Sequence, residues 1–199
     1  MVPKYVSDMS PIKGYELYRK LQEGDIVVDA GAFTGDYTIY AARKVGSKGR
    51  VIAFEPDSRN RMILKRNLEH EKIDNVIIVP KGLWSENTIL EFQGLAGVRS
   101  NLVSRAGNMS ISVVKLDDEL ARIGINRVDV IKMDIEGAEI EAIKGAVETL
   151  RKCNPFVVIA SYHQVEGKET NIFLEKHLGE LGYNTKSDFP THLTTYAWK

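Results

Sequence analysis

The sequence has very little cysteine, no long apolar run and no excess of charge of either sign. Its single cysteine, Cys153, excludes a disulfide within the chain and, with only four histidines, argues against a structural zinc site. Lys plus Arg and Asp plus Glu number 27 each, so no overall field draws the protein to nucleic acid or an anionic membrane. No stretch approaches the length of a membrane span, and the first residues lack the apolar core of a signal peptide. These absences favour a reducing, cytoplasmic setting.

The length predicts one domain. A chain of 199 residues can bury one sizeable core and is short for two, so we expect a single domain over residues 1–199. Residues 1–24 form its N-terminal segment, and the apolar spacing over 14–21 predicts a short helix there. This segment either packs on the sheet or covers a cofactor. The sequence leaves the oligomeric state open and allows a homodimer.

The stretch from Asp25 to Asp36, DIVVDAGAFTGD, contains the junction around which the chain is organised. Its β-branched run is too short for a helix and has the length of a buried parallel strand, which we expect to end at Asp29. Gly31 and Gly35 let the backbone turn sharply out of this strand into a helix that packs back on it. In a doubly wound α/β sheet, a cofactor binds at such a junction.

The glycine spacing discriminates between cofactors. A dinucleotide fingerprint needs G-x-G-x-x-G, but Phe33 stands in place of the second glycine and Asp36 in place of the third. The phosphate-loop pattern G-x-x-x-x-G-K-[ST] is absent from the chain. The remaining pattern, D-x-G-x-x-x-G, resembles the first motif of class I S-adenosylmethionine (SAM)-dependent methyltransferases, whose cofactor carries no phosphate. An ordinary strand-turn-helix junction is the alternative.

Further segments predict the rest of the sheet. Buried parallel strands are expected at 50–55, 75–80, 128–134 and 155–161. The tail over 183–199 adds two strands, an antiparallel pair at the C-terminal edge. Residues 88–92 and 110–114 predict a separate antiparallel pair, joined by a glycine-rich loop, 94–109, that is either a lid over the acceptor or without function. The fold class is therefore α/β, a doubly wound Rossmann-like sheet, mostly parallel with an antiparallel C-terminal edge.

Residues after the second and third strands are candidates for cofactor binding. Glu55 lies 24 residues after Gly31, close to the spacing at which an acid reaches the adenosine ribose in Rossmann-type sites. Alternatively, Glu55 caps a helix that begins near Pro56, itself a candidate contact. Gly82 and Leu83 lie where an adenine would stack and offer backbone and apolar contact.

Three carboxylates follow the fourth strand. Asp134, Glu136 and Glu139 lie close together at the start of a predicted helix over 135–150. Crowding of like charges at a strand end is costly unless a cation offsets it. The sulfonium and ammonium groups of SAM would do so.

Taken together, KMDIEGAE after the fourth strand, DAGAFTGDYT after the first and FEP after the second resemble the FkbM-like branch of the class I SAM-dependent methyltransferases. The resemblance covers residues 26–163. It implies a cofactor site lined by Asp29, Gly31, Gly35, Glu55 and Asp134, with Glu136 nearby. Phe33, in the glycine loop, is a further candidate for cofactor binding. It also implies O-methylation of a sugar or other small molecule, so the expected partner is a small-molecule or glycan acceptor.

The fifth strand ends near the predicted catalytic residues. Relatives carry an acid and then a histidine there, whereas this chain has Ser161 in place of the acid. His163 lies where an acceptor hydroxyl would lose its proton, and an unperturbed histidine titrates near neutrality. We therefore expect His163 to act as the base, Asp29 and Asp134 to orient the methionine part of SAM, and Glu55 to bind the ribose.

Other functions stay open at this level. Asp134, Glu136 and Glu139 could hold Mg²⁺ through oxygen, although the sequence favours carboxylates that serve the cofactor and no metal. An NAD-dependent oxidoreductase is the main rival enzyme class, and Phe33 and Asp36 argue against it. A non-catalytic Rossmann-like binding module is the third alternative.

Overall fold

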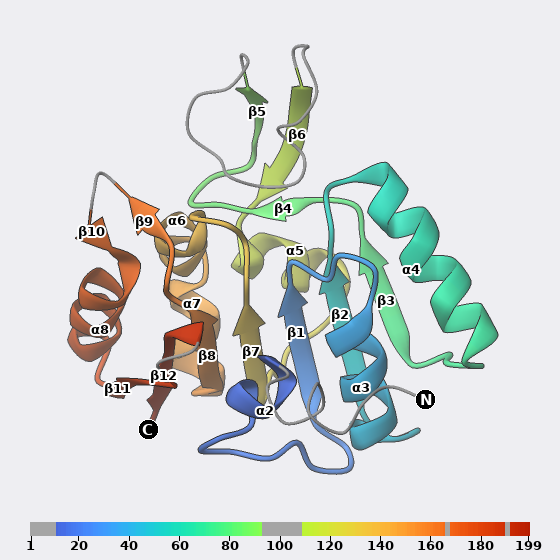
Figure 1. The fold of residues 1–199 in the computed structure, drawn as a ribbon, viewed down its shortest axis with the longest axis horizontal. Coiled ribbons are helices and arrows are strands. Elements are labelled where there is room, and N and C mark those ends of the chain that lie inside the picture. The colour runs from blue at the N-terminus through green and yellow to red at the C-terminus, as the bar shows by residue number, and fades with distance from the viewer. Residues whose placement is uncertain (1–10, 93–108, 166–167, 190–191) are drawn as a thin grey trace.

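A seven-stranded sheet forms the centre of the computed structural model, which describes residues 11–92, 109–165, 168–189 and 192–199 (Figure 1). The strands lie in the order β11-β12-β8-β7-β1-β2-β3. Their bounds are β1 (Ile26–Ala30), β2 (Arg50–Phe54), β3 (Val76–Val79), β7 (Val130–Met133), β8 (Phe156–Ala160), β11 (Asn184–Asp188) and β12 (Thr194–Trp198). The pairs among β3, β2, β1, β7 and β8 are parallel, and β12 is antiparallel to both β8 and β11. The predicted fold class is therefore confirmed.

Alternation along the central strands builds a core on each face of the sheet. Val28, Ile52 and Ile131 point to one face, where they join apolar side chains of α5 (Leu116–Arg122), α6 (Glu139–Lys144), α7 (Val147–Cys153) and α8 (Thr170–Glu180). The intervening residues point to the other face, under α2 (Pro11–Tyr15), α3 (Asp36–Val45) and α4 (Ser58–His70). Strands buried on both sides explain the continuous apolar runs of the sequence.

A smaller sheet rises above the ends of the parallel strands (Figure 1). It has the order β4-β6-β5, with β4 (Gly82–Leu83), β5 (Thr88–Phe92) and β6 (Met109–Val114). Strands β5 and β6 are antiparallel, as the sequence predicts. Except for Met109, the candidate lid over 94–109 lies outside the described residues. A two-stranded pair, β9 (Gln164–Val165) and β10 (Lys168–Glu169), follows β8.

The predicted helix over 14–21 is wrong, because α2 spans Pro11–Tyr15 and ends where that helix should begin. Polar side chains bind the backbone after it: Glu16 Oε1 accepts a hydrogen bond from Leu21 N (3.0 Å), and Asp25 Oδ2 accepts one from Gln22 N (2.8 Å). These bonds offer the backbone an alternative to helical pairing. None of the helices in the described part of the chain combines the length and apolar character needed to cross a membrane.

The predicted continuous helix over 135–150 is also wrong. The chain forms two short helices, α6 and α7, and residues before Glu139 form a turn. The break falls at Gly145, where an added Cβ would lie 2.0 Å from the carbonyl oxygen of Trp84. The close approach of another loop therefore interrupts a helix that the apolar spacing alone would continue.

Candidate active site

The sheet order brings predicted site residues together at the carboxyl ends of the central strands. Strands β8, β7, β1 and β2 are neighbours, and all four are parallel, so their carboxyl ends meet on one side of the sheet. The loops that follow these strands carry His163, Asp134, Gly31 and Glu55. This edge is where an open α/β sheet binds its ligand.

Gly31 lets two of these loops touch backbone to backbone. Its φ is +79°, and a Cβ built on it would lie 2.0 Å from the carbonyl oxygen of Asp134. Gly35 also has a positive φ, +102°, and its added Cβ would meet Leu64 Cδ1 at 2.5 Å. Gly31 therefore requires glycine for conformation and for space, whereas at Gly35 the conformation is the main constraint, because Leu64 Cδ1 is the end of a flexible side chain.

Phe33 and Glu55 join the first two loops. Phe33 has a φ of +50°, and its side chain is 48% exposed. Its backbone N–H donates a hydrogen bond to Glu55 Oε2 (2.8 Å), while Glu55 Oε1 accepts one from Asp57 N (2.9 Å). Burial raises the pKa of Glu55, although its bonds from the Asp57 and Phe33 backbone partly offset this. The helix cap that the sequence allowed for Glu55 is supplied by Asp57, which accepts from Arg59 N and Asn60 N.

Asp29 lies in a different setting from the one predicted. Strand β1 continues past it to Ala30, so its side chain points to the sheet face under α3 and not beyond the strand end. Asp29 is fully buried, and its Oδ1 accepts a hydrogen bond from Lys132 Nζ (2.9 Å) on β7. Its Oδ2 accepts one from Thr38 Oγ1 (2.6 Å). The charge of Asp29 is therefore balanced by the Lys132 ammonium inside the protein.

Lys132 is a site residue that the sequence analysis missed. Its ammonium also donates to the carbonyl oxygen of Gly31 (3.1 Å) and lies over the rings of Tyr15 and Tyr37, 5.6 and 5.5 Å from their centroids. A lysine between Ile131 and Met133 in a buried strand needs a buried acid, and this pattern could have revealed the pair.

Of the two residues predicted to contact the adenine, Gly82 is accessible and Leu83 is buried. Gly82 is half-buried, and a Cβ on it would lie 3.8 Å from Pro56 Cγ, so these two candidates are neighbours. Leu83 is only 2% exposed and packs in the core with Val114. The apolar contact expected from the Leu83 side chain thus goes to the core.

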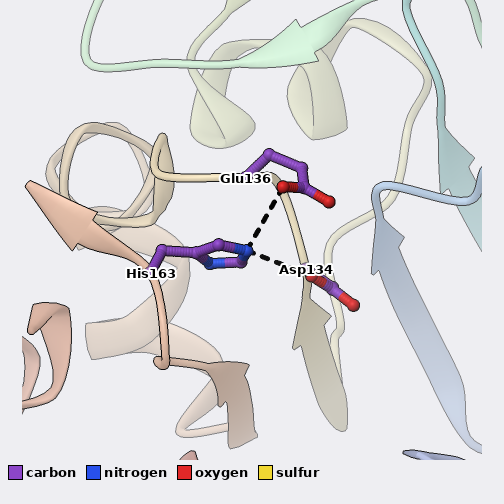
Figure 2. Close-up of side chains that lie close together, drawn as sticks. All are labelled: Asp134, Glu136 and His163. Atoms are coloured by element: carbon purple, nitrogen blue, oxygen red, sulfur yellow. Dashed lines mark ion pairs between the residues drawn. The ribbon is translucent and has the colours of Figure 1, made fainter. Parts of the chain in front are cut away.

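Four ionisable side chains converge between β7 and β8, three of which are drawn in Figure 2. His163 Nε2 lies 3.5 Å from Glu136 Oε2 and 3.9 Å from Asp134 Oδ1. On the other side of the ring, Nδ1 lies 3.1 Å from Glu139 Oε1. We call these four residues the carboxylate–histidine cluster.

The turn after β7 and the N-terminal segment hold this cluster. Glu136 has a φ of +57°, and Ile135 N donates a hydrogen bond to Glu139 Oε1 (3.0 Å), which ties the turn to the start of α6. Tyr15 Oη donates to Asp134 Oδ2 (2.9 Å). The N-terminal segment, for which the sequence left both packing and a covering role open, therefore contacts the site directly through Tyr15.

Electrostatics couple the members of the cluster. Burial lowers the pKa of His163. The adjacent carboxylate of Glu139 and the charges of Asp134 and Glu136 raise it by a larger amount, so the pKa lies above its usual value. Burial raises the pKa of Glu136; His163 opposes this and the neighbouring carboxylates add to it. Ser161 cannot replace the missing acid, because its hydroxyl bonds to Leu193 O and Thr195 Oγ1. Glu139 stands beside His163 instead.

The residues present fit a cationic nucleoside without phosphate. Gly31 has no side chain at the carboxyl ends of the strands, and Glu55, Asp134 and Glu136 bring negative charge there. SAM carries an ammonium and a sulfonium that such a site stabilises, whereas a pyrophosphate would be repelled by the same carboxylates.

Comparisons with known proteins agree with this chemistry. A family model described as the methyltransferase FkbM domain matches residues 29–185. Hexuronic acid methyltransferase AglP of Haloferax volcanii is 28% identical over 163 residues, which cover 80% of this chain and 65% of that protein. Methyltransferase sdnD of Sordaria araneosa is 29% identical over 163 residues, covering 64% of this chain and 62% of that protein. The chain thus spans slightly less than two thirds of the length of these relatives.

Solved structures show the same fold. The crystal structure of methyltransferase FkbM from Methylobacillus flagellatus KT has a TM-score of 0.70 at 20% identity and covers 92% of this chain and 46% of that one. Aeropyrum pernix fibrillarin, crystallised with natively bound SAM, has a TM-score of 0.62 at 15% identity and covers 96% of this chain and 74% of that one. With the family model spanning residues 29–185, the chain belongs to the FkbM family of SAM-dependent methyltransferases.

Proposed function

We propose that the protein transfers the methyl group of SAM to an oxygen of a small-molecule or glycan acceptor. The observation that carries this proposal is the carboxylate–histidine cluster, placed beside the glycine loop at the carboxyl ends of four neighbouring strands. In the reaction, the acceptor O–H and the S–CH₃ bonds break, and an O–CH₃ bond forms. S-adenosylhomocysteine and a proton leave. The protein aligns the two reactants, because the sulfonium already makes the methyl group electrophilic.

The proposed SAM site follows the crevice from β2 to β7. The loop from Gly31 to Gly35 would receive the nucleoside, with Glu55 at the ribose and Pro56 and Gly82 beside the adenine. Asp134 would face the methionine part. We assign Asp29 an indirect role, because it is fully buried and its carboxylate already pairs with the Lys132 ammonium. It would hold the glycine loop through Lys132, which also binds the Gly31 carbonyl.

The proposed acceptor side is the β8 end of the same edge. His163 faces Asp134 and Glu136, whose side chains are 25% and 43% exposed, so a hydroxyl can approach the two carboxylates that lie beside its buried Nε2. The acceptor class is suggested by the relative named as a hexuronic acid methyltransferase. Radiolabelled SAM incubated with free hexuronic acids, neutral sugars and glycan fractions tests this assignment, since label should appear in a sugar. Label confined to protein or RNA fractions would contradict it.

His163→Ala is expected to leave SAM binding within about twofold of the original chain and to lower turnover by at least about a hundredfold, the usual range for loss of a group that acts on the proton in flight. Calorimetry gives the affinity, and release of S-adenosylhomocysteine gives the rate. His70→Ala is the control, because His70 lies on the exposed side of α4, 85% accessible. Equal turnover in both variants would remove His163 from the reaction.

Phe33→Gly is expected to weaken SAM binding about tenfold while changing the free energy of unfolding by less than about 1 kcal/mol. Two effects on the free energy of unfolding oppose each other. Glycine adopts the positive φ of this position without strain, whereas the loss of a half-exposed ring and the greater freedom of the unfolded chain destabilise the folded protein. Calorimetry and urea denaturation measure the two quantities. Unchanged affinity would place the Phe33 ring outside the cofactor site.

A further inference from the structure

The His163 side chain is buried, and neither ring nitrogen has a hydrogen-bond partner among the described residues. Its side chain is 10% exposed, and Glu139 Oε1, although 3.1 Å from Nδ1, lacks the alignment of a hydrogen bond. Glu139 itself is fully buried, and its Oε2 also has no partner in the described part of the chain. Buried polar groups without partners are rare and costly, so this arrangement calls for an additional group.

The spacing of the cluster leaves room for an ion. If His163 were protonated and simply paired with its neighbours, a carboxylate would approach Nε2 to about 2.7–2.9 Å. Instead, the Glu136 and Asp134 oxygens stay at 3.5 and 3.9 Å. Two atoms each about 2.1 Å from a shared ion lie at most about 4.2 Å apart, and both distances satisfy this limit. The three donor atoms lie within 4.8 Å of one another, the bound that applies to the two carboxylate oxygens, and Figure 2 shows Glu136 and Asp134 both on the Nε2 side of the His163 ring.

The charge at this point is strongly negative. Asp134, Glu136 and Glu139 supply three carboxylates, and His163 supplies at most one positive charge. Lys132, on the strand that leads into the cluster, already pairs with Asp29. A bound cation would offset the remaining repulsion, independently of SAM.

We propose that Asp134, Glu136 and His163 bind a divalent metal ion on the acceptor side of the crevice. His163 would coordinate through Nε2, and Asp134 through Oδ1, which accepts only a long hydrogen bond from Tyr162 Oη (3.4 Å), whereas Tyr15 Oη binds Oδ2 at 2.9 Å. Glu139 Oε1, 3.1 Å from Nδ1, would accept a hydrogen bond from Nδ1–H once the ring turns into line, and so fix the tautomer that leaves Nε2 free, the usual arrangement around a metal-binding histidine. One imidazole nitrogen with two carboxylates suits a first-row ion such as Mn²⁺ or Fe²⁺ better than Mg²⁺, which prefers oxygen ligands only.

This ion would define the acceptor more closely, a consequence that rests on the proposed methyl transfer. Three protein ligands leave coordination positions open for the acceptor. An oxygen bound there has a lowered pKa, and its proton is lost to water, so His163 acts as a ligand in place of the predicted base. A compound with two neighbouring oxygens, such as a vicinal diol or a hydroxy acid, can occupy two positions at once. Such acceptors should therefore be preferred over isolated hydroxyls.

Mn²⁺ titration of the full chain tests the proposal. The protein is freed of metal with EDTA, dialysed, and titrated with Mn²⁺ while free Mn²⁺ is followed by electron paramagnetic resonance. We expect one Mn²⁺ per chain, with affinity lowered at least about tenfold in His163→Ala and Glu136→Gln. Glu141→Gln is the matched control, because Glu141 lies on α6 but pairs with Lys144 outside the cluster. SAM calorimetry on the same samples reports whether each variant is folded.

Each outcome decides the proposal. No stoichiometric binding up to about 1 mM Mn²⁺, or equal binding in all variants, would mean an adventitious ion only and would overturn it. Methyl transfer that survives EDTA but not His163→Ala would also overturn it and make His163 the base. SAM binding with no Mn²⁺ binding leaves the proposed function standing without the metal. Mn²⁺ binding with no SAM binding would instead contradict the proposed function alone.

Discussion

Gly31→Ala is expected to lower the free energy of unfolding by about 3 kcal/mol and to abolish measurable SAM binding. Two costs add: a φ of +79° is disfavoured by about 1–2 kcal/mol with a side chain, and forcing extra volume into a packed site costs about 1–3 kcal/mol. The added methyl would lie 2.0 Å from the Asp134 carbonyl oxygen, so the loops after β1 and β7 must separate. Urea denaturation and SAM calorimetry measure the two effects.

Gly124→Ala is the matched control for this change. Gly124 has nearly the same φ, +74°, but an added Cβ would meet nothing within 4 Å. Only the conformational cost, about 1–2 kcal/mol, should appear, and SAM binding should persist. If both variants lost the same stability and both bound SAM, the close contact between the two loops would be wrong.

Lys132→Met is expected to destabilise the protein by about 3–5 kcal/mol, because it leaves the Asp29 carboxylate buried without its partner. Lys132 and Asp29 are aligned neighbours on β7 and β1 and are 5% and 0% exposed. The ammonium also binds the Gly31 carbonyl, so the glycine loop should loosen and SAM binding should weaken. Chemical denaturation of each variant measures the loss.

A double substitution separates charge from packing. Asp29→Asn combined with Lys132→Met removes both charges and should recover at least about half of the lost stability, as replacement of whole buried ion pairs often does. Lys48→Met is the surface control: Lys48 faces Glu23 at 3.5 Å, but both side chains are mostly exposed, so the change should stay below about 1 kcal/mol. A double variant less stable than Lys132→Met would contradict the assignment of the loss to unpaired charge.

The sheet could be predicted from the sequence because its strands are short, apolar and bounded by turn residues. Runs such as VIAF at Val51–Phe54 are buried on both faces, which only a covered parallel sheet explains. The position of Glu55 after β2 and of Asp134 after β7 follows from these strands alone. The antiparallel edge of β12 was expected from the tail of the chain.

What the sequence could not predict depends on contacts between distant segments. The break in the helix at Gly145 is imposed by the Trp84 carbonyl, and the local apolar spacing does not indicate it. The pairing of Asp29 with Lys132 requires the register of β1 against β7. Likewise, Ser161 indicated that His163 lacked an acid, whereas the turn at Glu136 brings Glu139 beside it from another strand end.

Calorimetric titration of the purified chain with SAM tests most directly whether the crevice at these strand ends holds a positively charged nucleoside. We predict saturable binding of one SAM per chain, displaced by S-adenosylhomocysteine and lost in Gly31→Ala, with no comparable heat from NADH. The absence of any heat or thermal stabilisation at millimolar SAM, in a chain that is folded by circular dichroism, would contradict the account.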